Sequence, residues 1–241
     1  MELRLEWGPT GAAALAAECD VAVVVDVLTF STSVSVAADR GVAVRPYRWA
    51  DASAGDEARR HDAVLAVARG AASLGDVSLS PATFRTASDL ARVVLPSPNG
   101  STICAILAEA GADVVVAGLR NRRAVAAYLL DRGGRVLVVA AGERWPDGSL
   151  RPGIEDLWGA GGVVAALLDE GGPGVEASEE ARAAAAAYRL VEPRIGAALA
   201  ACPSGQELVG LGYASDVKIA AELDTSAAVP TLANGWLTSP Y

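Results

Sequence analysis

The sequence predicts an α/β fold, a three-layer α/β/α sandwich with a largely parallel or mixed sheet and a helical C-terminal portion. Three observations support this prediction. Short apolar runs, such as those at 21–27 and 135–141, alternate with helical segments of roughly ten residues. The runs are rich in Val and continuous, which indicates strands that are buried on both faces of a sheet. Residues after about position 170 are mainly helical in pattern. We therefore expect a single domain over 1–241, with a subdomain division near residue 170 as the alternative.

The elements follow from apolar runs, capping residues and glycine breaks. Strands are expected at short apolar runs, most of them rich in Val, at 3–7, 21–27, 42–47, 63–68, 92–95, 113–117 and 135–141. Helices are expected at 29–39, 51–60, 102–109, 121–132, 157–168, 177–190, 193–200, 204–211 and 216–222, several of them ending at a glycine. Residues 69–89 are interpreted as loop, and 229–241 as an apolar tail with turn residues.

Composition narrows the class of protein. Hydrophobic residues make up 52% of the chain and charged residues 20%, which predicts a sizeable core and argues against disorder. The net charge of −9 argues against a nucleic-acid partner or an anionic membrane surface. No apolar run reaches membrane-spanning length, and no signal-peptide core is visible. Three widely separated cysteines without a CxxC motif fit a reducing cytoplasm, where we expect the protein to reside.

Three groups of polar residues follow expected strands, and ligands in α/β sheets bind beyond the carboxyl ends of the strands. Asp26 follows the first Val-rich strand. The second group is the 96–102 loop, and the third is the 142–156 loop. Their convergence at one edge of the sheet is the main functional inference from the pattern alone.

The 142–156 loop is rich in charge. Its charged residues are the acids Glu143, Asp147, Glu155 and Asp156 and the arginines Arg144 and Arg151. Carboxylates on a flexible loop suit a hard divalent cation, whereas the alternative is a solvated loop whose acids cap the next helix. Glu155 and Asp156 are adjacent and diverge by roughly 100° on a helix, so one could bind a metal while the other caps or orients a water. Arg144 is placed to grip an oxyanion.

The 96–102 loop offers a candidate anion site. It places Ser97, Asn99, Gly100 and Ser101 at a strand-to-helix turn, where backbone N–H groups attract phosphate. It lacks the lysine of a nucleotide-binding P-loop, and plain helix capping is the alternative. For Asp26 the alternatives are a metal ligand or nucleophile and a capping acceptor for the following helix.

Other conspicuous residues are interpreted structurally. His61, the only histidine, lies in a surface-like context, which leaves a Ser-His-Asp triad poorly supported. Cys104 is expected to be a small core residue. Gly159, Gly161 and Gly162 follow an acidic loop instead of a strand, so close helix packing is favoured over a dinucleotide-binding fingerprint. Arg85 and Arg120 are secondary anion-binding candidates.

Four stretches, taken in order, carry a resemblance. They are VVVDVLTFSTSVSVAADRG at 23–41, LPSPNGSTIC at 95–104, AAGERWPDGSLRPGIEDLWGAGGVVAAL at 140–167 and SGQELVGLGYASDVKIAAELDTSAAVP at 204–230. Together they resemble the 2-phosphosulfolactate phosphatase family, Mg²⁺-dependent enzymes associated with coenzyme M biosynthesis. The chain departs from the family's pattern at Thr29, where members often have Arg. It also has Val67-Ala68-Arg69 where members tend to have Gly-Glu-Arg.

The resemblance implies a Mg²⁺-dependent phosphatase that acts on a small phosphorylated 2-hydroxy acid. The expected metal ligands are Asp26, Glu155 and Asp156; the expected catalytic residues are Asp26, Glu143 and Arg144; and the expected substrate-binding residues are Ser97, Asn99, Gly100, Ser101 and Thr29. A catalytically degraded paralogue that still binds a phosphorylated ligand or metal is the alternative, motivated by positions 29 and 68. The apolar tail with Trp236 and Tyr241 either forms a homodimer contact or packs on its own core, and the dimer is favoured.

Overall fold

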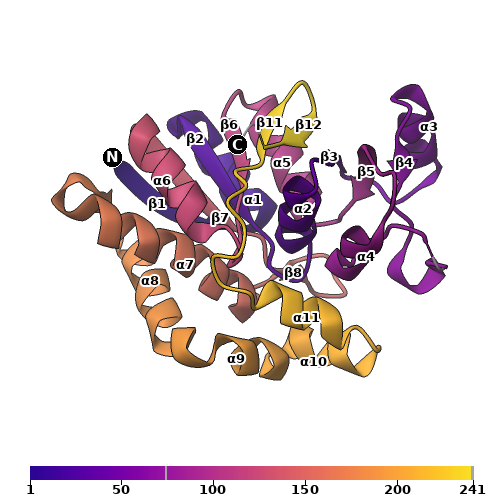
Figure 1. Cartoon of the computed structure of the whole chain (residues 1–241). Helices are drawn as coiled ribbons and strands as arrows, with labels where there is room; N and C mark the ends of the chain where they lie inside the picture. Colours follow the sequence, from indigo (N-terminus) through magenta and orange to yellow (C-terminus); the bar gives the residue numbers. More distant parts are fainter. Residues whose placement is uncertain (74, 240–241) are drawn as a thin grey trace.

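The structure is a computed structural model that describes residues 1–73 and 75–239. Its centre is a twisted mixed sheet with helices on both faces (Figure 1). In chain order the strands of this sheet are β1 (Glu2–Trp7), β2 (Val21–Val25), β3 (Ala43–Tyr47), β4 (Val64–Leu65), β5 (Arg92–Pro96), β6 (Asp113–Val116), β7 (Arg135–Ala140), β10 (Glu176–Ala177), β11 (Thr231–Ala233) and β12 (Trp236–Thr238). In space they are ordered β10-β1-β7-β2-β6-β11-β12-β3-β5-β4.

The sheet consists of two parallel blocks joined by an antiparallel hairpin. Strands β10, β1, β7, β2 and β6 are mutually parallel, and so are β3, β5 and β4. The C-terminal hairpin β11–β12 lies between the blocks and pairs antiparallel with β6 and with β3. The predicted α/β sandwich is therefore confirmed, and its sheet is mixed. The 229–241 segment, expected to be an apolar tail with turn residues, contains the strands of this hairpin, which were not expected. Tyr241 lies outside the described residues.

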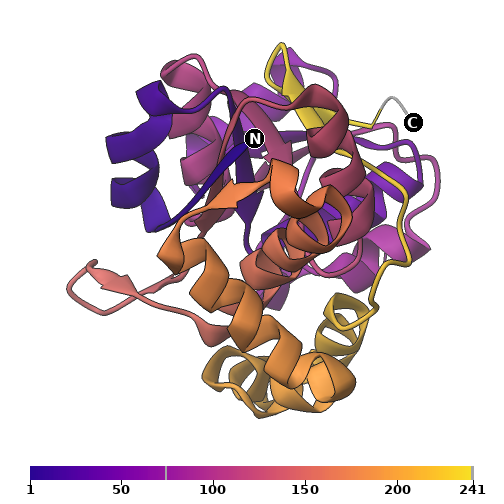
Figure 2. The same cartoon turned by 90° about the vertical axis from the view of Figure 1, so that its left-hand side faces the viewer.

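The helices form two layers. They are α1 (Gly8–Leu15), α2 (Phe30–Asp39), α3 (Ala52–Arg60), α4 (Pro81–Thr86), α5 (Gly100–Glu109), α6 (Arg122–Arg132), α7 (Ile154–Gly171), α8 (Glu179–Val191), α9 (Ile195–Ala201), α10 (Pro203–Gly210) and α11 (Ala214–Ala220). Figure 2 shows α9 to α11 gathered at one end of the molecule. Helix α4 lies in the segment interpreted as loop, which is a correction to the expectation for 69–89.

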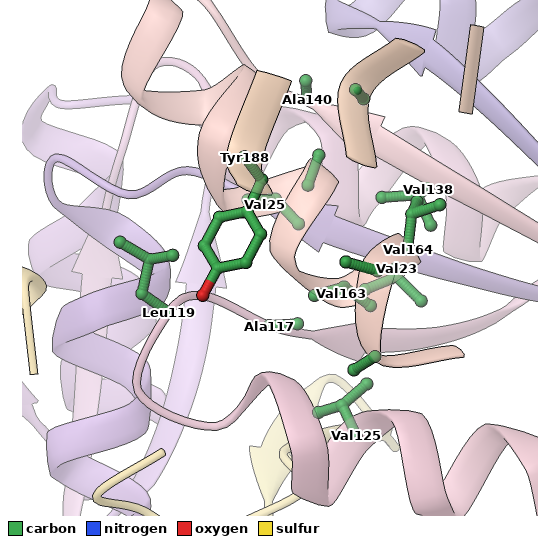
Figure 3. Close-up of a cluster of buried hydrophobic side chains, with 14 of the residues drawn as sticks. Val23, Val25, Ala117, Leu119, Val125, Val138, Ala140, Val163, Val164 and Tyr188 are labelled. Atoms are coloured by element: carbon green, nitrogen blue, oxygen red, sulfur yellow. The ribbon is translucent and has the colours of Figure 1, made fainter. Parts of the chain in front are cut away.

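Alternating residues of the buried strands belong to two separate hydrophobic cores, one on each face of the sheet. In β2, Val23 and Val25 join the first core, whereas Ala22 and Val24 join the second. Helices α6, α7 and α8 cover the first core, which Figure 3 shows closed by Tyr188 over the Val side chains. Helices α1, α2, α4 and α5 cover the second. Burial on both faces explains why these strands are continuous Val runs.

Glycines let α7 approach its neighbours closely. A Cβ on Gly159 would lie 2.4 Å from Val27 Cγ2, and one on Gly161 would lie 2.0 Å from the Ala184 carbonyl oxygen. The prediction that these glycines serve helix packing is therefore confirmed. Close packing fixes the N-terminus of α7, and with it Glu155 and Asp156, against the end of β2.

No helix within residues 1–73 and 75–239 is long and apolar enough to cross a lipid bilayer.

Candidate active site

Asp26 lies directly after β2, where two helices begin. Its Oδ1 accepts a hydrogen bond from the Phe30 N–H at 3.2 Å, and its Oδ2 accepts one from the Gly100 N–H at 2.9 Å. Phe30 and Gly100 are the first residues of α2 and α5. A Cβ on Gly100 would lie 2.2 Å from Phe30 Cδ1, so only glycine permits this contact. The predicted convergence of Asp26 with the 96–102 loop is therefore seen in the structure.

Glu155 and Asp156 occupy the first turn of α7 and are almost completely buried. The Asp156 carboxylate accepts the Val27 N–H through Oδ1 and the Gly142 N–H through Oδ2, both at 2.7 Å. It thus ties the segment after β2 to the segment after β7. With α2 and α5, a third helix N-terminus points at this acid cluster, and helix N-termini stabilise negative charge.

A short ribbon brings a fourth acid to the cluster. Strands β8 (Glu143–Arg144) and β9 (Leu150–Arg151) form a hairpin that projects from the body of the molecule, seen as the salmon loop in Figure 2. At its base, Glu143 Oε2 accepts a hydrogen bond from Asn99 Nδ2 at 3.0 Å. Arg144 is exposed, and its Nη2 donates to the Pro98 carbonyl at 3.3 Å. The ribbon therefore joins the 142–156 loop to the 96–102 loop.

Three acids of the cluster, Asp26, Glu143 and Asp156, have raised pKa values. Burial raises the pKa of Asp26 to about 6, and the negative charge of Glu155 adds to that rise. Burial raises the pKa of Glu143 to about 7, again reinforced by Asp26. The pKa of Asp156 is also raised, first by burial and then by the charges of Asp26 and Glu155. The cluster is thus a concentration of negative charge that a cation or protons would relieve.

This electrostatic strain predicts that the metal-free protein loses stability as pH rises. The folded-state pKa values of Asp26 and Glu143 lie above their ordinary values, so their contribution is fully present near pH 4 and is lost as pH rises through about 6 to 7. We expect urea unfolding in EDTA to give a lower free energy of unfolding at pH 8 than at pH 5, and Glu143→Gln to reduce that difference. An equal pH dependence in Glu143→Gln would contradict the assignment.

Arg69 is the positive group nearest to Asp26 that sequence reasoning missed as a site residue. Its Nη2 donates to Thr29 Oγ1 and to the Leu79 carbonyl, both at 2.5 Å. Its Nε lies 3.5 Å from Oδ2 of the buried Asp216, which accepts a hydrogen bond from Ser80 at 2.6 Å through Oδ1. Thr29 therefore holds Arg69 in place. The signal available in the sequence was the position of Arg69 just after an expected strand.

Two of the predicted phosphate contacts are engaged inside the protein. The Gly100 N–H donates to Asp26, and the Ser101 hydroxyl donates to the Leu95 carbonyl at 3.0 Å. The Asn99 side chain does not cap α5 and turns to Glu143 instead. Ser97 is buried beside this turn. The phosphate-binding roles of these four residues stay predictions, with their location beside the acids established.

A family model described as 2-phosphosulpholactate phosphatase matches residues 12–235. The chain belongs to the 2-phosphosulpholactate phosphatase family. It is 32% identical over 222 residues to a probable 2-phosphosulfolactate phosphatase of Deinococcus radiodurans, covering 90% of this chain and 89% of the relative. A protein of Microcystis aeruginosa with the same description is 28% identical over 218 residues, covering 88% of each chain. The predicted resemblance and the predicted class, a phosphoric monoester hydrolase, are confirmed.

The segment matched by the 2-phosphosulpholactate phosphatase model contains the four acids, the 96–102 turn and Arg69. The other conspicuous residues of the sequence make contacts outside the acid cluster. His61 contacts Glu57 and the edge of Trp236, and Cys104 is fully buried. Arg85 and Arg120, considered as secondary anion-binding residues, both pair with Glu222.

The donor chemistry of the acid cluster suits a hard divalent cation, since the four acids supply carboxylate oxygens in a buried, negatively charged setting. As the side chains lie, no group of three or more His, Cys, Asp or Glu residues in the described part of the chain is arranged to hold a metal ion. The reason lies partly in Asp156, whose two oxygens both face backbone amides. Each of these oxygens still has a second lone pair.

Proposed function

We propose that this chain is a Mg²⁺-dependent phosphatase that hydrolyses a small phosphorylated 2-hydroxy acid, related to 2-phosphosulfolactate, to the hydroxy acid and phosphate. One observation supports this most directly: a phosphatase-family chain brings Asp26, Glu143, Glu155 and Asp156 to the N-termini of three helices. Helix N-termini attract phosphate, and buried carboxylates attract a cation.

In this proposal Asp26 and Glu155 hold the Mg²⁺ ion, and Asp156 contributes through the lone pairs that its two amide partners leave. When bound, the ion supplies charge neutralisation for the phosphoryl oxygens and lowers the pKa of a coordinated water. Asp156 also fixes the segments after β2 and β7 relative to each other, because it accepts one N–H from each. The ion's site therefore depends on the same residue that organises the backbone around it.

The remaining residues act on the substrate. The first-turn amides of α5, with Ser97, Asn99 and Ser101, orient the phosphate, and the Gly100 N–H is shared with Asp26. Burial raises the pKa of Glu143, which favours this side chain as the carrier of the proton that the leaving alkoxide oxygen needs. Arg144 and Arg69 flank the cluster and pair with the carboxylate of the substrate. Thr29 supports Arg69 through its hydroxyl.

The proposal is tested by phosphate release from a panel of 2-phosphorylated hydroxy acids that includes 2-phosphosulfolactate. We expect turnover with Mg²⁺, loss of at least about 100-fold in EDTA, and recovery when Mg²⁺ is restored. Turnover that is unaffected by EDTA would refute the metal requirement. Absence of turnover for every panel member would refute the phosphatase.

Asp156→Asn should abolish Mg²⁺-dependent phosphate release. The amide retains one acceptor for Val27 or Gly142 but places an NH₂ group against the other N–H, and it removes the charge. Asp147→Asn, in the exposed turn of the ribbon, is the matched control and should behave like the parent. Circular dichroism separates loss of chemistry from loss of fold. Unchanged turnover in Asp156→Asn would remove this residue from the site.

A catalytically degraded binding protein is the alternative function. It is favoured by the departures at Thr29 and Ala68 and by the internal engagement of Gly100 and Ser101. Thermal stabilisation by a 2-phosphorylated acid without any phosphate release would support it.

A homodimer in the cytoplasm stays a prediction. Trp236, on which the dimer was partly based, lies under Arg45 and Arg92 of its own chain at 5.6 and 5.7 Å from the ring centroid. Apolar side chains are exposed elsewhere, including Trp145 and Leu150 on the projecting ribbon. Sedimentation of the parent and of Trp145→Ser would show whether the ribbon holds two copies together.

A further inference from the structure

An open cavity of about 410 Å³ lies beside the acid cluster, between α3, β4 and the end of β5. Its wall is mainly aliphatic and includes Ala54, Leu65, Ala66, Val67, Leu79 and Pro96. The charged residues that line it are Asp51 and Arg69. Its size falls within the range of pockets that bind small molecules, which are typically apolar with a few placed polar groups.

Three residues of the cavity wall link the cavity to elements of the candidate active site. Arg69 lines the cavity and donates to Thr29, three residues after Asp26. Leu79 also lines it, and its carbonyl accepts from both Arg69 and Thr29. Pro96, at the end of β5, immediately precedes Ser97 of the phosphate turn. A ligand whose phosphate lies at this turn can therefore extend past Arg69 into the cavity.

The charge of the cavity does not suit a sulfonate. A sulfonate is ionised at all relevant pH values, and its burial against an aliphatic wall requires a paired positive group. Among the described residues that line the cavity, Arg69 is the one cation, and its Nη2 and Nε already face Thr29, Leu79 and Asp216. Asp51 accepts the Ser53 N–H as the N-cap of α3 and adds negative charge. The Arg69 guanidinium can pair with one carboxylate of a ligand, and the rest of the ligand then lies against an aliphatic surface.

Three consecutive residues, Val67, Ala68 and Arg69, form part of the same wall. A glutamate at position 68 would make the wall acidic and polar, whereas alanine leaves it apolar. The residue at position 68 thus affects the chemistry of the part of a ligand that lies beyond the carboxylate.

We propose that the cavity binds an aliphatic or aromatic substituent, so that the substrate is the 2-phosphate ester of a 2-hydroxy acid with an apolar side chain, its carboxylate paired with Arg69. The inference rests on the proposed phosphatase function and specifies its substrate class. An apolar substituent loses contact with water when it enters the cavity, and this favours it over a sulfomethyl group.

The test compares kcat/KM with Mg²⁺ for 2-phospholactate, 2-phosphosulfolactate, 2-phospho-4-methylpentanoate and 2-phospho-3-phenylpropanoate. We expect the two apolar esters to exceed 2-phosphosulfolactate by at least about tenfold. Ala54→Phe, on the buried face of α3, fills the cavity. It should lower kcat/KM for the two large esters by at least about tenfold and change that for 2-phospholactate by less than about threefold. Ala127→Phe, on the exposed face of α6, is the control of equal size.

A second variant tests the proposal in case Ala54→Phe does not fold. Ala68→Glu adds a carboxylate at an exposed position of the wall and should lower the preference for the apolar esters without a change in unfolding temperature. A parent protein that prefers 2-phosphosulfolactate overturns the inference and leaves the proposed phosphatase intact. If no ester is hydrolysed, the proposed function fails, and the thermal shifts induced by the same esters decide the inference. Equal shifts for the parent and for Ala54→Phe would then overturn it.

Discussion

Asp26→Asn is expected to lower phosphate release on the order of 10³-fold, one of the two largest effects on activity that we expect in this chain, together with that of Asp156→Asn. The carboxylate accepts the first N–H groups of both α2 and α5 and faces Glu155 and Glu143. An asparagine retains one acceptor and turns an NH₂ group toward the other N–H, so the two helix N-termini no longer share one anion. The cation-binding charge is lost as well.

The fold should survive this substitution. An unmatched N–H costs about 1–3 kcal/mol, but the change also removes a negative charge that burial and Glu155 disfavour. Asp113→Asn, at the exposed start of β6, is the matched control and should leave activity unchanged and stability within about 0.5 kcal/mol. The measurements are phosphate release with Mg²⁺ and thermal unfolding by circular dichroism. Turnover of Asp26→Asn within about threefold of the parent would exclude Asp26 from the chemistry.

The meeting of Asp26 with the 96–102 turn was predicted on the rule that ligands in α/β sheets bind beyond the carboxyl ends of the strands. Both segments follow strands and begin helices. The rule alone does not account for the contact, because β2 and β5 belong to blocks that run in opposite directions on the two sides of the β11–β12 hairpin. The two-faced core was predictable from local pattern, since the continuous Val runs of β2 and β7 divide their alternate residues between two helix layers.

Two hairpins were missed although the sequence carries their turn signals. Asn234-Gly235 connects β11 to β12 with φ of 52° and 80°, the positive values that a type I′ turn requires. Asp147-Gly148 lies in the turn of the β8–β9 ribbon. Both hairpins have strands of only two or three residues, too short to show alternation. The insertion of β11–β12 between β6 and β3 depends on pairing across the whole chain and has no local signal.

The roles of the adjacent acids could not be separated from the sequence. The sequence places both Glu155 and Asp156 at the start of a helix and does not distinguish their roles. The structure shows that the Asp156 carboxylate accepts hydrogen bonds from two backbone N–H groups in different segments. Arg69 posed a similar problem. Its contacts with Thr29 and Leu79 join residues 40 and 10 positions away in the chain, and no residue pattern specifies such a pairing.

Gly161→Ala is expected to lower the free energy of unfolding by about 3 kcal/mol. The added Cβ would lie 2.0 Å from the Ala184 carbonyl oxygen and 2.6 Å from its carbon, both in the backbone of α8. A backbone atom cannot move aside as a flexible side chain can, so α7 and α8 must separate. Because α7 begins with Glu155 and Asp156, we expect activity to fall as well, even below the temperature at which the variant unfolds.

Gly55→Ala is the matched control, because it is the same substitution in a helix with open space. An added Cβ would meet only the end of the Arg59 side chain, at 3.5 Å, so the higher helix propensity of alanine should raise stability by about 0.5–1 kcal/mol. Urea unfolding of both variants, at one pH and with EDTA, measures the two changes in the free energy of unfolding, which we expect to have opposite signs. If Gly161→Ala changed the free energy of unfolding by less than about 1 kcal/mol, α7 and α8 would have room to part, and the contact would not fix the acids as argued.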